Sequence, residues 1–220
     1  MPQHAALIFD ADGTLVDSET PGLEVIRQLA AAEGLALASE QAHRQFRGLR
    51  MAEVSGWIAA RLDRPAEDFA RHFIPRVRQA QAEQFGREGL REIPGARALL
   101  QSLRMPFCVA TNGPREKVTQ TLALCGLDGL LGERVYCAYE VGSFKPEPGL
   151  FLHAARALGV DPADCAVVED SLPGALAGLA AGMTVYTLLP PEEAPATLRP
   201  QLRFIDSLPH LQQLLEPAGP

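Results

Sequence analysis

The sequence predicts an α/β fold, a doubly wound parallel sheet of the Rossmann-like type, with an all-helical domain inserted into it. The first apolar run, Ala6 to Phe9, has no polar alternation, which is typical of a strand buried on both faces. From Pro94 onward, short apolar runs alternate with helical segments, the pattern of a parallel sheet with crossover helices. Residues 16–87 between these regions have a helical pattern. We therefore expect a core of residues 1–15 and 88–220 and a helical cap domain of residues 16–87.

Composition sets the class of protein and its expected surroundings. The chain has 220 residues, 47% of them hydrophobic and 21% charged, as in ordinary globular proteins. Its net charge of −7 and the lack of a Lys/Arg-dense block argue against nucleic acid as a partner. No apolar run approaches a membrane span, no secretory leader is recognisable, and the four cysteines form no C-x-x-C pair. We expect a cytoplasmic protein without a membrane partner, either a monomer or a weak homodimer.

The inserted region is predicted to contain four helices. Thr20 and Pro21 suit a helix start, with a capping hydroxyl before a proline in the first turn, and Gly34 suits its end. We expect no strand between Leu15 and Gly89. The other predicted helices cover 39–46, 51–62 and 65–85.

The region after the insert is predicted to supply the remaining strands of the sheet and the helices that cover them. Four further strands are expected at 106–110, 135–138, 165–168 and 184–188. Helices are expected at 94–104, 115–126, 173–181 and 208–215, with another ending at 158.

Two acids follow the first strand directly. Asp10 and Asp12 are two residues apart, so in extended chain their carboxylates lean to the same side. Two carboxylates in one pocket need either a cation or a shared proton, which suits a nucleophile beside an acid/base. A capped turn is the plain alternative. An EF-hand loop does not fit, because Gly13 follows the second acid directly.

Polar groups also follow the later strands. Thr111 and Asn112 end one strand, Glu169 and Asp170 end another, and Lys145 lies in a loop after a third. Singly, each has a structural explanation as a helix cap or a solvated charge. Because the carboxyl ends of parallel strands share one edge of the sheet, we expect these groups to converge with the first two acids in a catalytic site.

These motifs, in this order, resemble those of the haloacid dehalogenase superfamily, in particular its phosphatases and phosphosugar mutases with a helical cap inserted after the first motif. The resemblance covers nearly the whole chain. It rests on Asp10-Ala-Asp12-Gly-Thr-Leu, Thr111-Asn112, Lys145-Pro146 and Glu169-Asp170-Ser171. The second acid of the first motif, Asp12, resembles the phosphatase form of the motif.

The resemblance implies a role for each motif residue. Asp10 would be the nucleophile that forms an aspartyl-phosphate, and Asp12 the general acid and base. Thr111 and the amide of Asn112 would hold phosphoryl oxygens, and Lys145 would offset negative charge. Mg²⁺ would bind Asp10, the backbone carbonyl of Asp12, Asp170 and Glu169. Gly174 departs from some relatives, which have an acid there, and this leaves the role of Glu169 open.

The cap sequence bears on the choice between a phosphatase and a mutase. A mutase must hold the second phosphate of a bisphosphate, and β-phosphoglucomutases have an arginine for this where the present chain has Met51. Arg50 lies one place earlier, and Arg47 is the other cation of this loop. The alternative is that both arginines belong to an ordinary solvent-exposed face. We expect a phosphatase that acts on a sugar or sugar-acid phosphate, similar to phosphatases of 6-phosphogluconate.

A signalling module that accepts a phosphoryl group is a more distant alternative. Receiver domains also combine an acidic pocket, a threonine and a lysine. Their phosphorylated aspartate follows a later strand, however, and they carry no cap.

Overall fold

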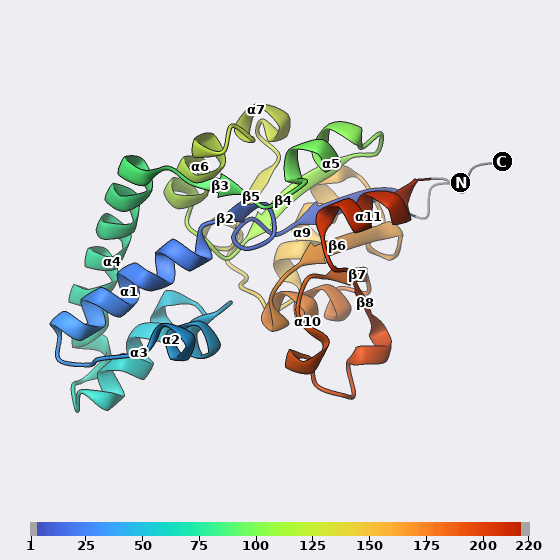
Figure 1. The fold of residues 1–220 in the computed structure, drawn as a ribbon. Helices are drawn as coiled ribbons and strands as arrows, with labels where there is room; N and C mark the ends of the chain where they lie inside the picture. Colours follow the sequence, from blue (N-terminus) through green and yellow to red (C-terminus); the bar gives the residue numbers. More distant parts are fainter. Residues whose placement is uncertain (1–3, 217–220) are drawn as a thin grey trace. The chain divides into compact units, whose positions relative to one another are not determined.

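The computed structural model describes residues 4–216, which divide into two compact units (Figure 1). Of these residues, 4–17 and 91–216 form the sheet unit, and the helical unit runs from Ser18 to Leu90. The sequence-based borders, 15/16 and 87/88, differ slightly from these. The difference arises because β2 (Val16–Asp17) pairs antiparallel with β3 (Arg91–Glu92), and this pairing holds both ends of the insertion to the sheet unit.

A six-stranded sheet forms the centre of the sheet unit. The strand order is β5-β4-β1-β6-β7-β8, and every neighbouring pair is parallel. This confirms the predicted fold class. The strands are β1 (Ala6–Phe9), β4 (Phe107–Thr111), β5 (Val135–Cys137), β6 (Cys165–Glu169), β7 (Thr184–Thr187) and β8 (Leu202–Phe204).

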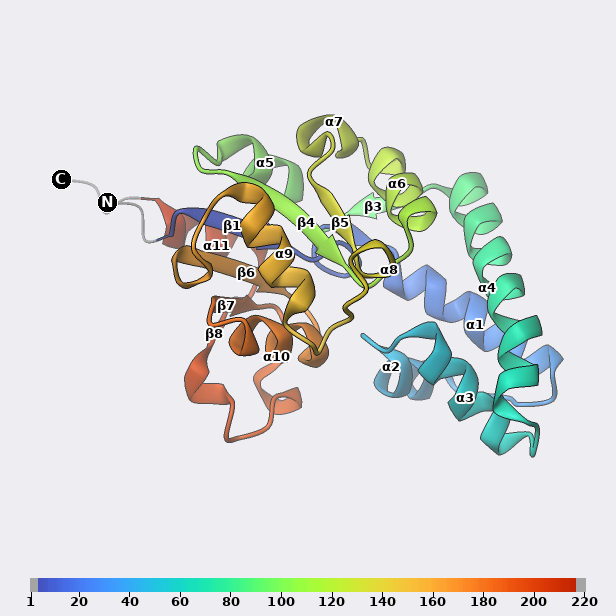
Figure 2. The ribbon, with the colours of Figure 1, turned by 180° about the vertical axis from the view of Figure 1, so that it is seen from behind.

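Helices cover both faces of this sheet. The pair α9 and α10 lies on one face (Figure 2), where Ala6 and Ile8 of β1 pack in a core with Leu150 and Ala175 of these helices. The pair α5 and α11 lies on the other face (Figure 1). The helices of the sheet unit are α5 (Ala96–Ser102), α6 (Arg115–Leu124), α7 (Asp128–Leu131), α8 (Ala138–Val141), α9 (Gly149–Leu158), α10 (Leu172–Ala180) and α11 (Leu208–Leu215).

The position of β1 explains where a site can form. After β1 the chain builds β4 and β5 outward on one side, and later β6, β7 and β8 on the other. The carboxyl end of β1 therefore lies at a topological switch point, where loops diverge and leave room for a ligand. Phe9 at this end is level with Val109 of β4 and Val168 of β6, so the next residues of all three strands emerge together.

The helical unit consists of four helices around their own apolar core. Ile26 of the first helix, Phe46 of the second, Ile58 of the third and Phe73 of the fourth are buried in one cluster. The helices are α1 (Glu19–Ala32), α2 (Ser39–Phe46), α3 (Met51–Arg61) and α4 (Ala66–Glu88).

Three local predictions were wrong. Val16 and Asp17 form the short strand β2 inside the range where no strand was expected. The edge strand β8 was missed, because three residues are too few to show a period. The first helix begins at Glu19 after Ser18, so Thr20 lies inside the helix and not at its cap.

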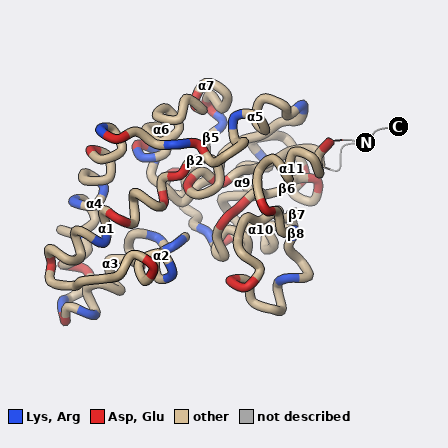
Figure 3. Tube along the Cα trace, viewed as in Figure 1, with Lys and Arg blue, Asp and Glu red and all other residues tan. Residues whose placement is uncertain are grey.

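The sequence has no Lys/Arg-dense block, and residues of both charges are mixed in the structure as well (Figure 3). Figure 3 shows basic and acidic residues interspersed along both units. The four cysteines are free and buried. Among residues 4–216, the structure contains no helix with the length and apolarity required to cross a bilayer.

Candidate active site

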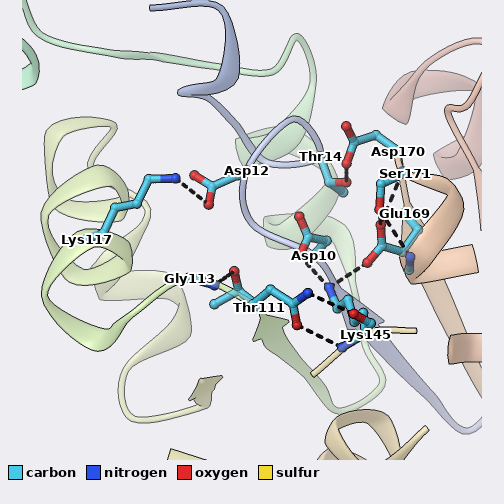
Figure 4. Close-up of polar contacts among 12 residues, drawn as sticks. Asp10, Asp12, Thr14, Thr111, Gly113, Lys117, Lys145, Glu169, Asp170 and Ser171 are labelled. Carbon is cyan, nitrogen blue, oxygen red and sulfur yellow. Dashed lines mark hydrogen bonds and ion pairs between the residues drawn. The ribbon is translucent and has the colours of Figure 1, made fainter. Parts of the chain in front are cut away.

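Three buried carboxylates meet at the carboxyl edge of the sheet (Figure 4). Asp10 follows β1, Glu169 is the last residue of β6, and Asp170 comes next. One oxygen from each lies within 4.8 Å of the others. All three residues are buried, with at most 8% of their surface exposed. Such a cluster of hard oxygen donors suits a divalent cation that prefers carboxylates.

Lys145 lies against two of these acids. Its Nζ donates to Oδ1 of Asp10 and to Oε1 of Glu169, each at 2.5 Å. Its side chain is 3% exposed. With all groups ionised, the three carboxylates carry −3 and Lys145 carries +1, so the buried cluster keeps a charge of −2.

Burial dominates the electrostatics of this cluster. Loss of solvation raises the pKa of Asp10 to about 7, with further increases from Glu169 and Asp12, although Lys145 opposes the shift. Burial likewise raises the pKa of Glu169. Burial alone would lower the pKa of Lys145, but the carboxylates of Asp10 and Glu169 raise it above its usual value. Without a further cation, the folded protein therefore favours a proton among these acids.

The loop after β1 positions the third acid. The hydroxyl of Thr14 is fully buried and donates to Oδ1 of Asp170 over 3.1 Å. Gly13 has a φ of +83°, which favours glycine, and a Cβ there would overlap with the Asp170 carboxylate. The glycine of the first motif therefore has two functions: it permits the turn and leaves space for an acid from another strand.

Gly174, where some relatives have an acid, gives Glu169 the space it occupies. A Cβ at Gly174 would overlap with the Glu169 carboxylate. Oε2 of Glu169 accepts from the hydroxyl of Ser171 at 3.0 Å, and the same hydroxyl accepts from the amide of Gly174 at 3.2 Å as the cap of α10. Ser171 is thus a helix cap that also orients an acid of the cluster.

Asp12 faces away from the three acids. Its Oδ2 accepts from Nζ of Lys117 in α6 at 2.8 Å, and Figure 4 shows the two side chains directed toward each other. The backbone of this loop is held by hydrogen bonds from the amides of Leu15 and Val16 to the carbonyl of Ala11. The two acids of the first motif thus contact different lysines.

The end of β4 supplies the next two motif residues. Thr111 is buried, and its Oγ1 accepts from the amide of Gly113 at 3.0 Å. The side chain of Asn112 forms a reciprocal pair with the backbone of Lys145: its Nδ2 donates to the carbonyl at 3.2 Å, and its Oδ1 accepts from the amide at 2.9 Å. The Asn112 side chain therefore fixes the loop that carries Lys145.

The two arginines expected to contact substrate belong to the helical unit. Nε of Arg47 lies 3.4 Å from Oε2 of Glu19. Arg50 precedes α3, where its backbone amide donates to Glu53 at 2.9 Å and its side chain contacts the same carboxylate. Their role toward a substrate stays a prediction.

The sequence reasoning missed three residues that contact predicted site residues. Lys117 contacts Asp12, Thr14 contacts Asp170, and Ser171 contacts Glu169. Thr14 lies within the first motif and could have been found there. Lys117 lies inside a helix, far along the chain from Asp12, and no motif spacing links the two residues.

Comparison with known proteins gives matches over both units. The model of the haloacid dehalogenase-like hydrolase family matches residues 4–182. The 6-phosphogluconate phosphatase of Escherichia coli K12 is 29% identical over 219 residues, which cover 100% of this chain and 98% of that protein. Hexitol phosphatase A of the same organism is 34% identical, with 86% and 84% covered. A crystal structure of a family hydrolase from Deinococcus radiodurans R1 with bound phosphate and sodium is 33% identical, with a TM-score of 0.75 and 99% and 100% covered.

Proposed function

Because the chain belongs to the haloacid dehalogenase-like hydrolases and is a phosphatase of that family, we propose that it hydrolyses a small sugar or sugar-acid phosphate with Mg²⁺ as cofactor. The observation that carries the proposal is the buried group of three acids around Lys145. Such a group binds a metal and offers one carboxylate to phosphorus. The small-molecule substrate is the one partner we propose, and the cytoplasm the location.

The donor set fits Mg²⁺ in chemistry and in charge. Carboxylates of Asp10, Asp170 and Glu169, with the carbonyl of Asp12, are the hard oxygens that Mg²⁺ prefers. A divalent cation would cancel the charge of −2 that the cluster keeps beside Lys145. When bound, the ion would reduce the repulsion between these acids and an anionic phosphate.

Asp10 is the nucleophile in this proposal. Its carboxylate oxygen forms a bond to phosphorus while the bond from phosphorus to the ester oxygen breaks, which leaves an aspartyl-phosphate. Lys145, within 2.5 Å of Asp10, stabilises negative charge on the transferred group, and the Thr111 hydroxyl and the Asn112 amide hold its other oxygens.

Asp12 is the general acid and the general base in this proposal. It donates a proton to the departing ester oxygen and then accepts one from the water that attacks phosphorus. The second step releases inorganic phosphate and restores the Asp10 carboxylate.

The helical unit is the cap in this proposal, with Arg47 and Arg50 as contacts for the polar part of the substrate and closure as the means of excluding bulk water. Met51, the residue at the position of the mutase arginine, begins α3 and packs against the apolar cluster of the helical unit. Its packing role favours hydrolysis over the mutase reaction. The relatives that act on 6-phosphogluconate and on hexitol phosphates support this substrate class.

A phosphate-release panel tests the proposal. It includes sugar phosphates, sugar-acid phosphates, phosphoglycolate and nucleotides, with Mg²⁺ or EDTA. We expect Asp10→Asn to abolish Mg²⁺-dependent release, and the control Asp206→Asn, at a side chain 98% exposed, to leave it unchanged. Activity retained in Asp10→Asn would refute the nucleophile.

The panel also separates the two alternatives. Primer-dependent conversion of β-glucose 1-phosphate to glucose 6-phosphate that outpaces phosphate release would identify a mutase. A phosphoryl group that stays on the protein for hours would identify a signalling module.

A further inference from the structure

We propose that Lys117 is a positioning residue for Asp12, and that it acts by holding one of the two oxygens of this acid/base carboxylate. The inference rests on the proposed function, in which Asp12 protonates the leaving oxygen. It concerns a residue of α6 that belongs to none of the four motifs. The contact itself is short and half-buried: Nζ lies 2.8 Å from Oδ2, with the side chains 28% and 22% exposed.

The use of lysine in this chain is the first argument. Of its 20 basic residues, 18 are arginines and only Lys117 and Lys145 are lysines. Both contact an acid of the first motif: Lys145 contacts Asp10 and Lys117 contacts Asp12. In a chain that otherwise uses arginine for surface charge, this pairing indicates that lysine is required at both places.

The location of Lys117 on its helix is the second argument. α6 begins at Arg115, so Lys117 lies in the first turn, where the helix dipole disfavours a cation. Local helix stability therefore does not explain the residue. The contact with Asp12 does, because it places a carboxylate beside the charge.

The rigidity of the Asp12 backbone is the third argument. The amides of Leu15 and Val16 both donate to the carbonyl of Ala11, and Gly13 donates to Val16 at 2.8 Å, which closes a tight loop around Asp12. With the backbone fixed, the direction of the carboxylate depends on side-chain torsions alone. A contact that restrains these torsions orients the acid, as the third group of a catalytic triad orients its base.

The chemistry of lysine explains why arginine is not used here. An ammonium is a point charge, and here it contacts one oxygen, Oδ2. A guanidinium pairs with both oxygens of a carboxylate through its planar fork. Lys117 therefore contacts Oδ2 alone, whereas a guanidinium would engage both oxygens of Asp12.

Two phosphate esters distinguish this role from a structural one. The leaving group of p-nitrophenyl phosphate departs without a proton. The leaving group of an alkyl phosphate, here the best substrate found in the phosphate-release panel, requires one. Since kcat/KM reports the steps up to formation of the phosphoenzyme, it includes the donation of this proton and excludes the later attack of water. We expect Lys117→Met to lower kcat/KM for the alkyl phosphate about 10-fold and for the aryl phosphate less than about 2-fold.

Lys117→Arg is the second variant, and Glu116→Gln, an exposed neighbour in the same turn, is the control. We expect Lys117→Arg to keep the thermal midpoint but also to lose alkyl phosphate activity, because the fork engages both oxygens. Equal losses on the two esters, or wild-type activity in Lys117→Arg, would overturn the inference alone. A wild-type protein that hydrolyses neither ester would instead overturn the proposed function.

Discussion

Removal of Lys145 should strongly destabilise the sheet unit in the absence of metal. In Lys145→Met, the carboxylates of Asp10 and Glu169 stay buried but lose the cation that they share. Removing one partner from a buried ion pair costs about 3 to 5 kcal/mol. We expect this loss at about pH 8 in EDTA and a smaller loss at about pH 5, where Asp10, whose pKa is raised to about 7, accepts a proton.

Hydrogen exchange is the suitable assay for Lys145→Met. The one tryptophan, Trp57, lies in the helical unit, so its fluorescence does not report on the sheet. Amides of β1 should lose protection by between about a hundredfold and several thousandfold, the equivalent of that free energy. Lys117→Met, which removes a lysine whose side chain is 28% exposed, is the matched control and should cost less than about 1 kcal/mol. A loss below about 1 kcal/mol in Lys145→Met would refute the claim that the cluster is charged and buried.

Two further predictions follow from the same cluster. The folded, metal-free protein holds a proton on Asp10 that the unfolded chain has released, so its stability should fall as the pH rises from 3.8 to about 7. Thermal midpoints in EDTA over this range test the sign, and a midpoint that rises instead would contradict it. Gly174→Ala should weaken Mg²⁺ binding and destabilise the protein, because the new Cβ meets the carboxylate of Glu169, whereas Gly56→Ala, in an open helical position, should stabilise it by about 0.5 to 1 kcal/mol. Calorimetry measures the Mg²⁺ affinity and the stability of both variants. Equal values in the two variants would show that the space at Gly174 is not required.

Much of this architecture could be predicted because its signals are local and strong. β1 and β6 are continuous apolar runs that end abruptly in acids, and a parallel sheet brings such ends to one edge. The convergence of Asp10, Lys145 and Glu169 follows from topology once these strands are recognised. The order of the strands did not have to be known, since every parallel order places the carboxyl ends on the same edge.

The features that could not be predicted depend on orientation and on very short elements. β8 consists of three residues at the sheet edge, and pairing with β7 defines it more than its own sequence does. Lys117 meets Asp12 because of the rotation of α6 about its axis, which the sequence around residue 117 does not encode. The sequence shows only that Gly174 replaces an acid found in some relatives. It does not show that the side chain of Glu169 occupies the space beside this glycine.

The central place of β1 has a consequence for biosynthesis. β1 is made first but pairs with β4 and β6, which lie roughly 100 and 160 residues later on the chain. On the ribosome, Asp10 must therefore wait for most of the polypeptide before it meets Glu169, while the four helices of residues 18–90 can already assemble around their own core. A nascent chain that stops before β6 would present an unpaired apolar strand edge and no complete acid cluster.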